Sequence, residues 1–154
     1  MKPLVCCAMF VIALSFTAAA IHSRVARAAA PDRLATVSVT RIFTGPDGLT
    51  HAEPIEVSLS PGSIPKLQQS APENVASAYF VSVEPGFVED WHNASAHRYV
   101  FTLSGRAEIE LAGGEKIPLD HDRVLLADDL TGKGHITRVI GKEAWIAAFV
   151  QIEK

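Results

Sequence analysis

The stretch Gly86-Phe-Val-Glu-Asp-Trp-His-Asn-Ala-Ser-Ala-His-Arg-Tyr-Val-Phe-Thr-Leu-Ser-Gly105 decides the fold. Five residues separate Gly86 from His92, and six separate Arg98 from Gly105. Residues 99–103 are rich in aromatic and β-branched side chains, which favours a strand. The stretch therefore predicts a strand between two glycine turns, with histidine and arginine side chains close to it.

Working outward from this stretch, short apolar segments alternate with glycine and proline turns, which is typical of an all-β sandwich or barrel. The strands expected are residues 36–44, 55–59, 78–83, 99–103, 108–111, 115–119, 124–127, 135–140 and 145–152. Residues 68–78 have room for a short helical turn, which Pro72 limits. Closing the sheet removes exposed strand edges, so we expect residues 31–154 to form a single antiparallel, jelly-roll-like β-barrel domain.

The N-terminal segment has the features of a secretory signal peptide. Lys2 is followed by residues 4–20, an uncharged apolar run, and A-x-A-type cleavage points end at Ala20 and Ala28. We expect residues 1–28 to be a signal peptide cleaved near 20 or 28, and the mature protein to be secreted or periplasmic. An uncleaved membrane anchor is the alternative, although the run is short for a span of ~20 residues.

The charge balance of the mature chain excludes two classes of partner. Removal of residues 1–28 takes away Lys2, Arg24 and Arg27 and no acid, leaving 11 basic against 17 acidic residues and a net charge of −6. No basic cluster remains, so we expect no nucleic-acid partner, and no membrane partner after cleavage. Both cysteines leave with the signal peptide, so burial alone must stabilise the domain.

The stretch from Gly86 to Gly105 resembles the first motif of the cupin family, G-x5-H-x-H-x3/4-E-x6-G. Ala94 stands where the family has its second histidine, and Arg98 stands where it has glutamate. The segment Gly132-Lys-Gly-His135 is similar to the G-x2-H part of the second motif, in which leucine and valine replace the usual proline and asparagine. The resemblance covers about residues 79–153 and implies a cupin barrel.

The resemblance also implies a divalent metal inside the barrel, held by three histidines and a glutamate. Carried over residue by residue, only His92 and His135 remain, with His97 nearby in sequence as a third ligand. Other side chains that could complete the set are Glu84, Asp90, Asp128 and His121. The metal would be zinc, manganese, iron or nickel, since imidazole suits several of these ions. Many cupins form dimers, so the resemblance implies a homodimer as well.

Arg98 is the departure that separates two hypotheses. A guanidinium repels a divalent cation but can bind a carboxylate through two hydrogen bonds. The first hypothesis is an exported cupin that binds a small organic ligand, favouring a carboxylate, through Arg98, His92, His135 and Tyr99. The second is a metal-dependent oxygenase, lyase or isomerase acting on a small organic acid. Whether the protein is an enzyme stays open at this point, and no residue is assigned as catalytic.

Overall fold

Every regular element of the described chain is a β-strand. The computed structural model describes residues 35–153, which belong to one compact unit. The strands are β1 (Thr36–Thr44), β2 (Thr50–Ser58), β3 (Ser60–Pro61), β4 (Gln68–Gln69), β5 (Val75–Val83), β6 (Val88–His92), β7 (Arg98–Ser104), β8 (Ala107–Glu110), β9 (Lys116–Leu119), β10 (Val124–Asp128), β11 (His135–Val139) and β12 (Trp145–Ile152).

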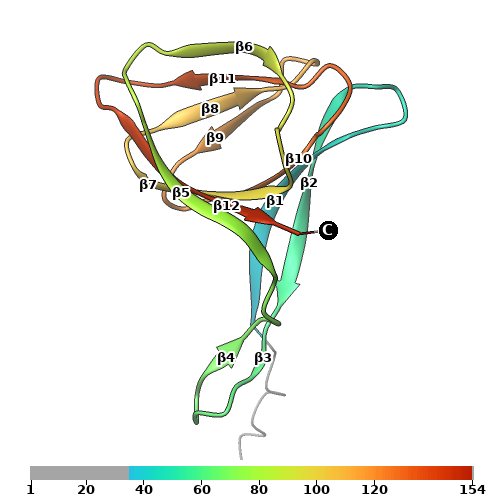
Figure 1. The fold of residues 1–154 in the computed structure, drawn as a ribbon, viewed down its shortest axis with the longest axis vertical. Helices are drawn as coiled ribbons and strands as arrows, with labels where there is room; N and C mark the ends of the chain where they lie inside the picture. The colour runs from blue at the N-terminus through green and yellow to red at the C-terminus, as the bar shows by residue number, and fades with distance from the viewer. Residues whose placement is uncertain (1–34, 154) are drawn as a thin grey trace, which may run out of the picture. The chain divides into compact units, whose positions relative to one another are not determined.

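The strands form two large sheets and one short hairpin (Figure 1). The first sheet has six strands in the order β2-β1-β10-β7-β12-β5, and the second has four in the order β6-β11-β8-β9. Strands β3 and β4 form the hairpin. All pairings are antiparallel except β1 with β10. A parallel pair needs a long connection between its strands, and β1 and β10 are far enough apart in the chain to provide one.

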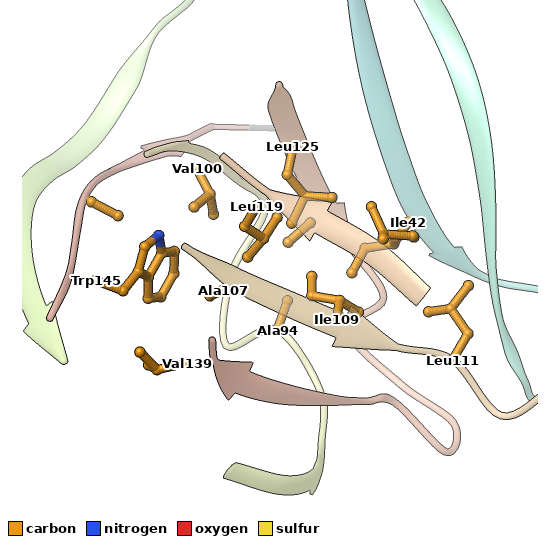
Figure 2. Close-up of a cluster of buried hydrophobic side chains, with 13 residues drawn as sticks. Ile42, Ala94, Val100, Ala107, Ile109, Leu111, Leu119, Leu125, Val139 and Trp145 are labelled. Carbon is orange, nitrogen blue, oxygen red and sulfur yellow. The ribbon is translucent and has the colours of Figure 1, made fainter. Parts of the chain in front are cut away.

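A hydrophobic core lies between the two sheets (Figure 2). Val100, Leu125 and Ala147 come from the six-stranded sheet, and Ile109 and Leu119 come from the four-stranded sheet. All five side chains are at most 5% exposed. The sheets therefore pack face to face, as in a sandwich.

A second, smaller core lies on the other face of the six-stranded sheet. It is built from Val39, Leu126 and Ile152, with Tyr99 among the half-buried residues packed against them. Leu126 follows Leu125 directly, and successive side chains of a strand point to opposite faces. This alternation decides which residues of β7 and β10 reach the space between the sheets.

The predicted all-β class is confirmed. The two facing sheets agree with the sandwich or barrel that the short, turn-separated strands predict. The helical turn considered for residues 68–78 is wrong, because this segment contains β4 and the start of β5. Within residues 35–153 no helix is long and apolar enough to cross a membrane. The signal peptide predicted for residues 1–28 lies outside the described residues.

Candidate ligand-binding site

His92 and His135 lie side by side. His92 ends β6 and His135 begins β11, and the two residues are direct partners in the antiparallel register of the four-stranded sheet. Their ring centroids are 4.3 Å apart, with the ring planes inclined by 57°. The structure thus brings together the two histidines that the motifs single out.

A buried aspartate orients His135. Its Nδ1 lies 2.6 Å from Oδ2 of Asp129, whose side chain is fully buried, and Thr50 donates its hydroxyl to the same oxygen over 3.1 Å. Because a carboxylate oxygen accepts, Nδ1 of His135 carries a hydrogen, and in the neutral ring the lone pair is then on Nε2. Oδ1 of Asp129 is buried without a hydrogen-bond partner in the described part of the chain.

His92 has different surroundings from its neighbour. Its Nδ1 donates to the backbone carbonyl of Asp90 over 2.8 Å, and its Nε2 lies 3.4 Å from a carboxylate oxygen of Glu89. The His92 side chain is 24% exposed, compared with 6% for His135. Both nitrogens of His92 therefore face acceptors, whereas His135 has a carboxylate on one side only.

A cavity of about 380 Å³ opens between the sheets beside this histidine pair. Its apolar wall includes Val81, Val100, Leu125, Trp145 and Phe149. Its polar lining includes Glu89, His92, Ser95, Arg98, His135 and Thr137. The volume lies within the ~300–1,000 Å³ range of small-molecule sites, and an apolar wall with a few convergent polar groups is their usual composition.

Arg98 is the cationic group of the cavity. Its guanidinium donates to the hydroxyl of Tyr79 over 3.3 Å and to that of Ser95 over 3.1 Å, and its Cζ lies 5.0 Å from the ring centroid of Phe149. None of the ion pairs found within residues 35–153 involves Arg98. The guanidinium is therefore held in place by neutral groups, and within the described residues it forms no ion pair, although Glu89 lines the same cavity.

His97 does not join this site, although it was a candidate third ligand. Its Nδ1 contacts a carboxylate oxygen of Asp128, and the other carboxylate oxygen accepts from Arg41 over 2.9 Å. Burial lowers the pKa of Arg41, but its bonds and charges with Glu53 and Asp128 outweigh this, so the pKa is raised overall. His97 precedes Arg98, the inward residue, and is therefore directed to the other face of the sheet.

Tyr99 is also outside the cavity, contrary to the expectation that it would bind the ligand. It follows Arg98 on β7 and borders a second cavity of about 320 Å³ on the other face of the six-stranded sheet. Its hydroxyl donates to Glu73 over 3.0 Å. Burial, with a further contribution from Glu73, raises the pKa of Tyr99 to about 12.

This raised pKa predicts a specific loss of stability at alkaline pH. Because the folded-state pKa of Tyr99 exceeds its unfolded value of about 10, the neutral hydroxyl contributes fully below pH 10, and the contribution disappears as pH rises through 12. Urea unfolding between about pH 9 and 12 should show the wild type losing stability more steeply than Tyr99→Phe. Parallel curves for the two proteins would contradict this assignment.

The described residues do not complete a catalytic metal set. Within residues 35–153 no group of three or more His, Cys, Asp or Glu side chains is arranged to hold a metal ion. The other candidates Glu84, Asp90, Asp128 and His121 are also absent from the cavity lining. The cavity lining holds one carboxylate, that of Glu89, which lies beside His92, but these two side chains and His135 are not arranged to hold a metal and a guanidinium lines the same cavity. This set does not fit the three protein ligands that catalytic zinc usually has.

Two acidic residues of the site were missed from the sequence. Asp129 looked like a loop residue, and Glu89 lies in a strand that the apolar pattern did not indicate. A usable signal for Asp129 was its position immediately after Asp128 at the end of β10, since neighbouring residues face opposite sides. Only one of the two aspartates could then point toward His135.

Comparisons with known proteins identify no family for this chain. No protein-family model matches it, and no curated protein matches it. Among solved structures, it is similar to the crystal structure of protein NMB1881 from Neisseria meningitidis, with 10% sequence identity and a TM-score of 0.39. That similarity covers 57% of this chain and 90% of the other chain.

Proposed function

We propose that residues 31–154 form an exported small cupin that binds a small organic carboxylate in the cavity between its sheets. The observation that carries the proposal is the guanidinium of Arg98, which borders a cavity with an apolar wall and has only neutral hydrogen-bond partners. Arg98 is half-buried and forms no ion pair within residues 35–153, so its charge is available to a ligand. A ligand carboxylate supplies the opposite charge, and its shape allows two parallel hydrogen bonds to a guanidinium.

Calorimetric titration tests this proposal with matched pairs of ligands, each an acid and its neutral amide, such as benzoate with benzamide and succinate with succinamide. At least one acid should bind, and its amide should bind at least tenfold more weakly, because hydrogen bonds to charged groups contribute about 1.5–3 kcal/mol. Arg98→Met should weaken binding of the acid by a similar factor.

The matched control is Arg123→Met, since Arg123 is exposed, donates to Thr40 and does not line the cavity. This variant should bind the acid as the wild type does. Equal affinity for an acid and its amide would contradict carboxylate recognition, as would an Arg98→Met protein with unchanged affinity.

The second candidate function is the metal-dependent enzyme, which the adjacent imidazoles of His92 and His135 favour. Asp129 supports His135 in the way that an outer carboxylate often supports a metal-bound histidine. Within residues 35–153 no third side chain is arranged with the two histidines to hold a metal, and a guanidinium lies in the same cavity. Both observations speak against a metal enzyme, and we derive no reaction step through a metal. Both candidate functions concern an exported protein, and the proposal of export to the periplasm or the exterior rests on residues 1–28.

The partner we propose, besides the ligand, is a second copy of the chain. Strand β5 is the outer strand of the six-stranded sheet, and its sequence VASAYFVSV contains no charge and no proline. Natural proteins usually protect such edges with one or the other. Two β5 strands can pair about a two-fold axis, which would cover backbone groups and Phe80, a side chain that is 76% exposed.

Light scattering after size exclusion measures this association. The wild type should have the mass of a dimer, and Phe80→Asp should shift it to a monomer, because a carboxylate at the centre of the edge strand repels its symmetry mate. Ile64→Asp is the matched control, since Ile64 is 63% exposed but lies outside β5. A monomeric wild type would contradict the proposed partner.

A further inference from the structure

Carboxylate binding by Arg98 does not account for the buried pair Asp129–His135. Asp129 is 0% exposed and shares one oxygen with His135 and Thr50. Burying a carboxylate in this way is costly. A negative charge near the cavity weakens the binding of an anion. The buried carboxylate therefore points to a further task for His135.

The hydrogen bonding gives His135 the form of a general base. Its Nδ1 hydrogen is directed at Asp129, which leaves Nε2 as the atom that can take up a proton, and none of the hydrogen bonds found within residues 35–153 uses Nε2. His135 is also part of the cavity lining. A carboxylate behind an imidazole fixes its tautomer and stabilises the imidazolium formed when the ring takes a proton.

The contacts of His92 suit the complementary acid. One ring nitrogen donates to the carbonyl of Asp90 and the other faces the carboxylate of Glu89, so a doubly protonated ring would have an acceptor at each nitrogen. Its centroid is 4.3 Å from that of His135. Two imidazoles with the contacts that suit a proton donor and a proton acceptor thus border the same cavity as the guanidinium of Arg98.

We infer that this cavity catalyses metal-independent proton transfer at a carbon atom of a small oxo acid, with His135 as base and His92 as acid. The inference rests on the proposed function, because Arg98 holds the carboxylate of the substrate. Nε2 of His135 removes a proton from the carbon next to the keto group. The electron pair of that C–H bond forms a C=C bond, and the keto oxygen receives a proton from Nε2 of His92, which gives the enol.

The reverse steps restore the keto acid, and the proton returns to carbon from His135. No oxidant, reductant or second substrate is needed, since each bond that breaks is replaced by one that forms. The immediate consequence is exchange of carbon-bound hydrogen with solvent, and an isomerisation follows if the proton returns to another position. Asp129 is a positioning residue in this scheme, because it acts only through His135.

Proton NMR in D2O tests the inference with 2-oxobutyrate and phenylpyruvate as probes. The wild type should replace hydrogen by deuterium at C3 faster than buffer does. His135→Asn should reduce the rate at least a hundredfold, as general base catalysis typically contributes 10²–10⁴-fold. The control His51→Asn removes an exposed imidazole that is likewise paired with an aspartate, Asp47, and should leave the rate unchanged.

Calorimetry on the same samples separates this inference from the proposed function. Binding of the probes that depends on Arg98, without any exchange, would overturn the proton transfer and leave carboxylate binding intact. Undiminished exchange in His135→Asn would also overturn it. Failure of the wild type to bind either probe would count against the oxo-acid assignment, whereas binding of other acids over their amides would preserve the proposed function.

A spectroscopic measurement on the wild type keeps the inference testable if a variant fails to fold. Nitrogen-15 shifts should show His135 with its hydrogen on Nδ1, and Asp129→Asn should change this tautomer or its population while lowering the exchange rate. A hydrogen on Nε2 of His135 in the wild type would overturn the assignment of the base.

Discussion

Arg98→Glu is expected to exchange the ligand class of the cavity, from small carboxylates to divalent cations. At ~4 Å a guanidinium and a dication repel each other by roughly 8 kcal/mol at an effective dielectric constant of 20. The substitution removes this repulsion and adds a carboxylate beside His92 and His135, which line the same cavity. Titration with zinc, manganese and nickel should show at least a hundredfold gain in affinity, and carboxylate binding should be lost.

Arg123→Glu makes the same change of charge at an exposed position outside the cavity, and both affinities should stay at their wild-type values. This control separates a local effect from a change in net charge. Tight metal binding by the wild type that is unchanged or weaker in Arg98→Glu would contradict the anion site. In that event the metal-dependent enzyme becomes the better account of the histidine pair.

Most of the strands can be predicted from the sequence because apolar side chains at every second position of a strand face the core. Strands β1 and β12 have the bounds that their apolar residues predict. Strand β6, with the sequence VEDWH, escapes this reading because all but one of its residues are exposed, so no alternation is visible. It forms through backbone pairing with β11, which the local sequence does not encode.

The site residues divide in the same way. Arg98 and Tyr99 are neighbours on β7 and must face opposite sides, so assigning both to one cavity ignored the alternation. The partner of His97 is Asp128, which is 31 residues away in the chain, and no local pattern signals a contact of that kind. The proximity of His92 and His135 could be anticipated only through the spacing of the two motifs.

Gly134→Ala is expected to destabilise the domain more than an ordinary surface substitution, and to damage the site. Gly134 has φ of +74° and precedes His135. A Cβ there would overlap the backbone carbonyl of His92 and lie 3.0 Å from the backbone nitrogen of Asn93. Left-handed strain costs about 1–2 kcal/mol and overpacking about 1–3 kcal/mol. We therefore expect a loss of about 3 kcal/mol, or a fall in Tm on the order of 10 °C.

Gly114→Ala provides the matched control, because Gly114 has φ of +81° and its added Cβ would meet nothing within 4 Å. It carries the strain without the overlap, so its Tm should fall by only about 5 °C. Calorimetric melting of both variants measures the difference. The overlap at Gly134 is with the residue that pairs with His135, and relieving it must move β6 away from β11. Gly134→Ala should consequently lose carboxylate affinity, whereas Gly114→Ala should keep it. Equal melting temperatures for the two variants would contradict the prediction, because they would show that moving β6 does not destabilise the domain.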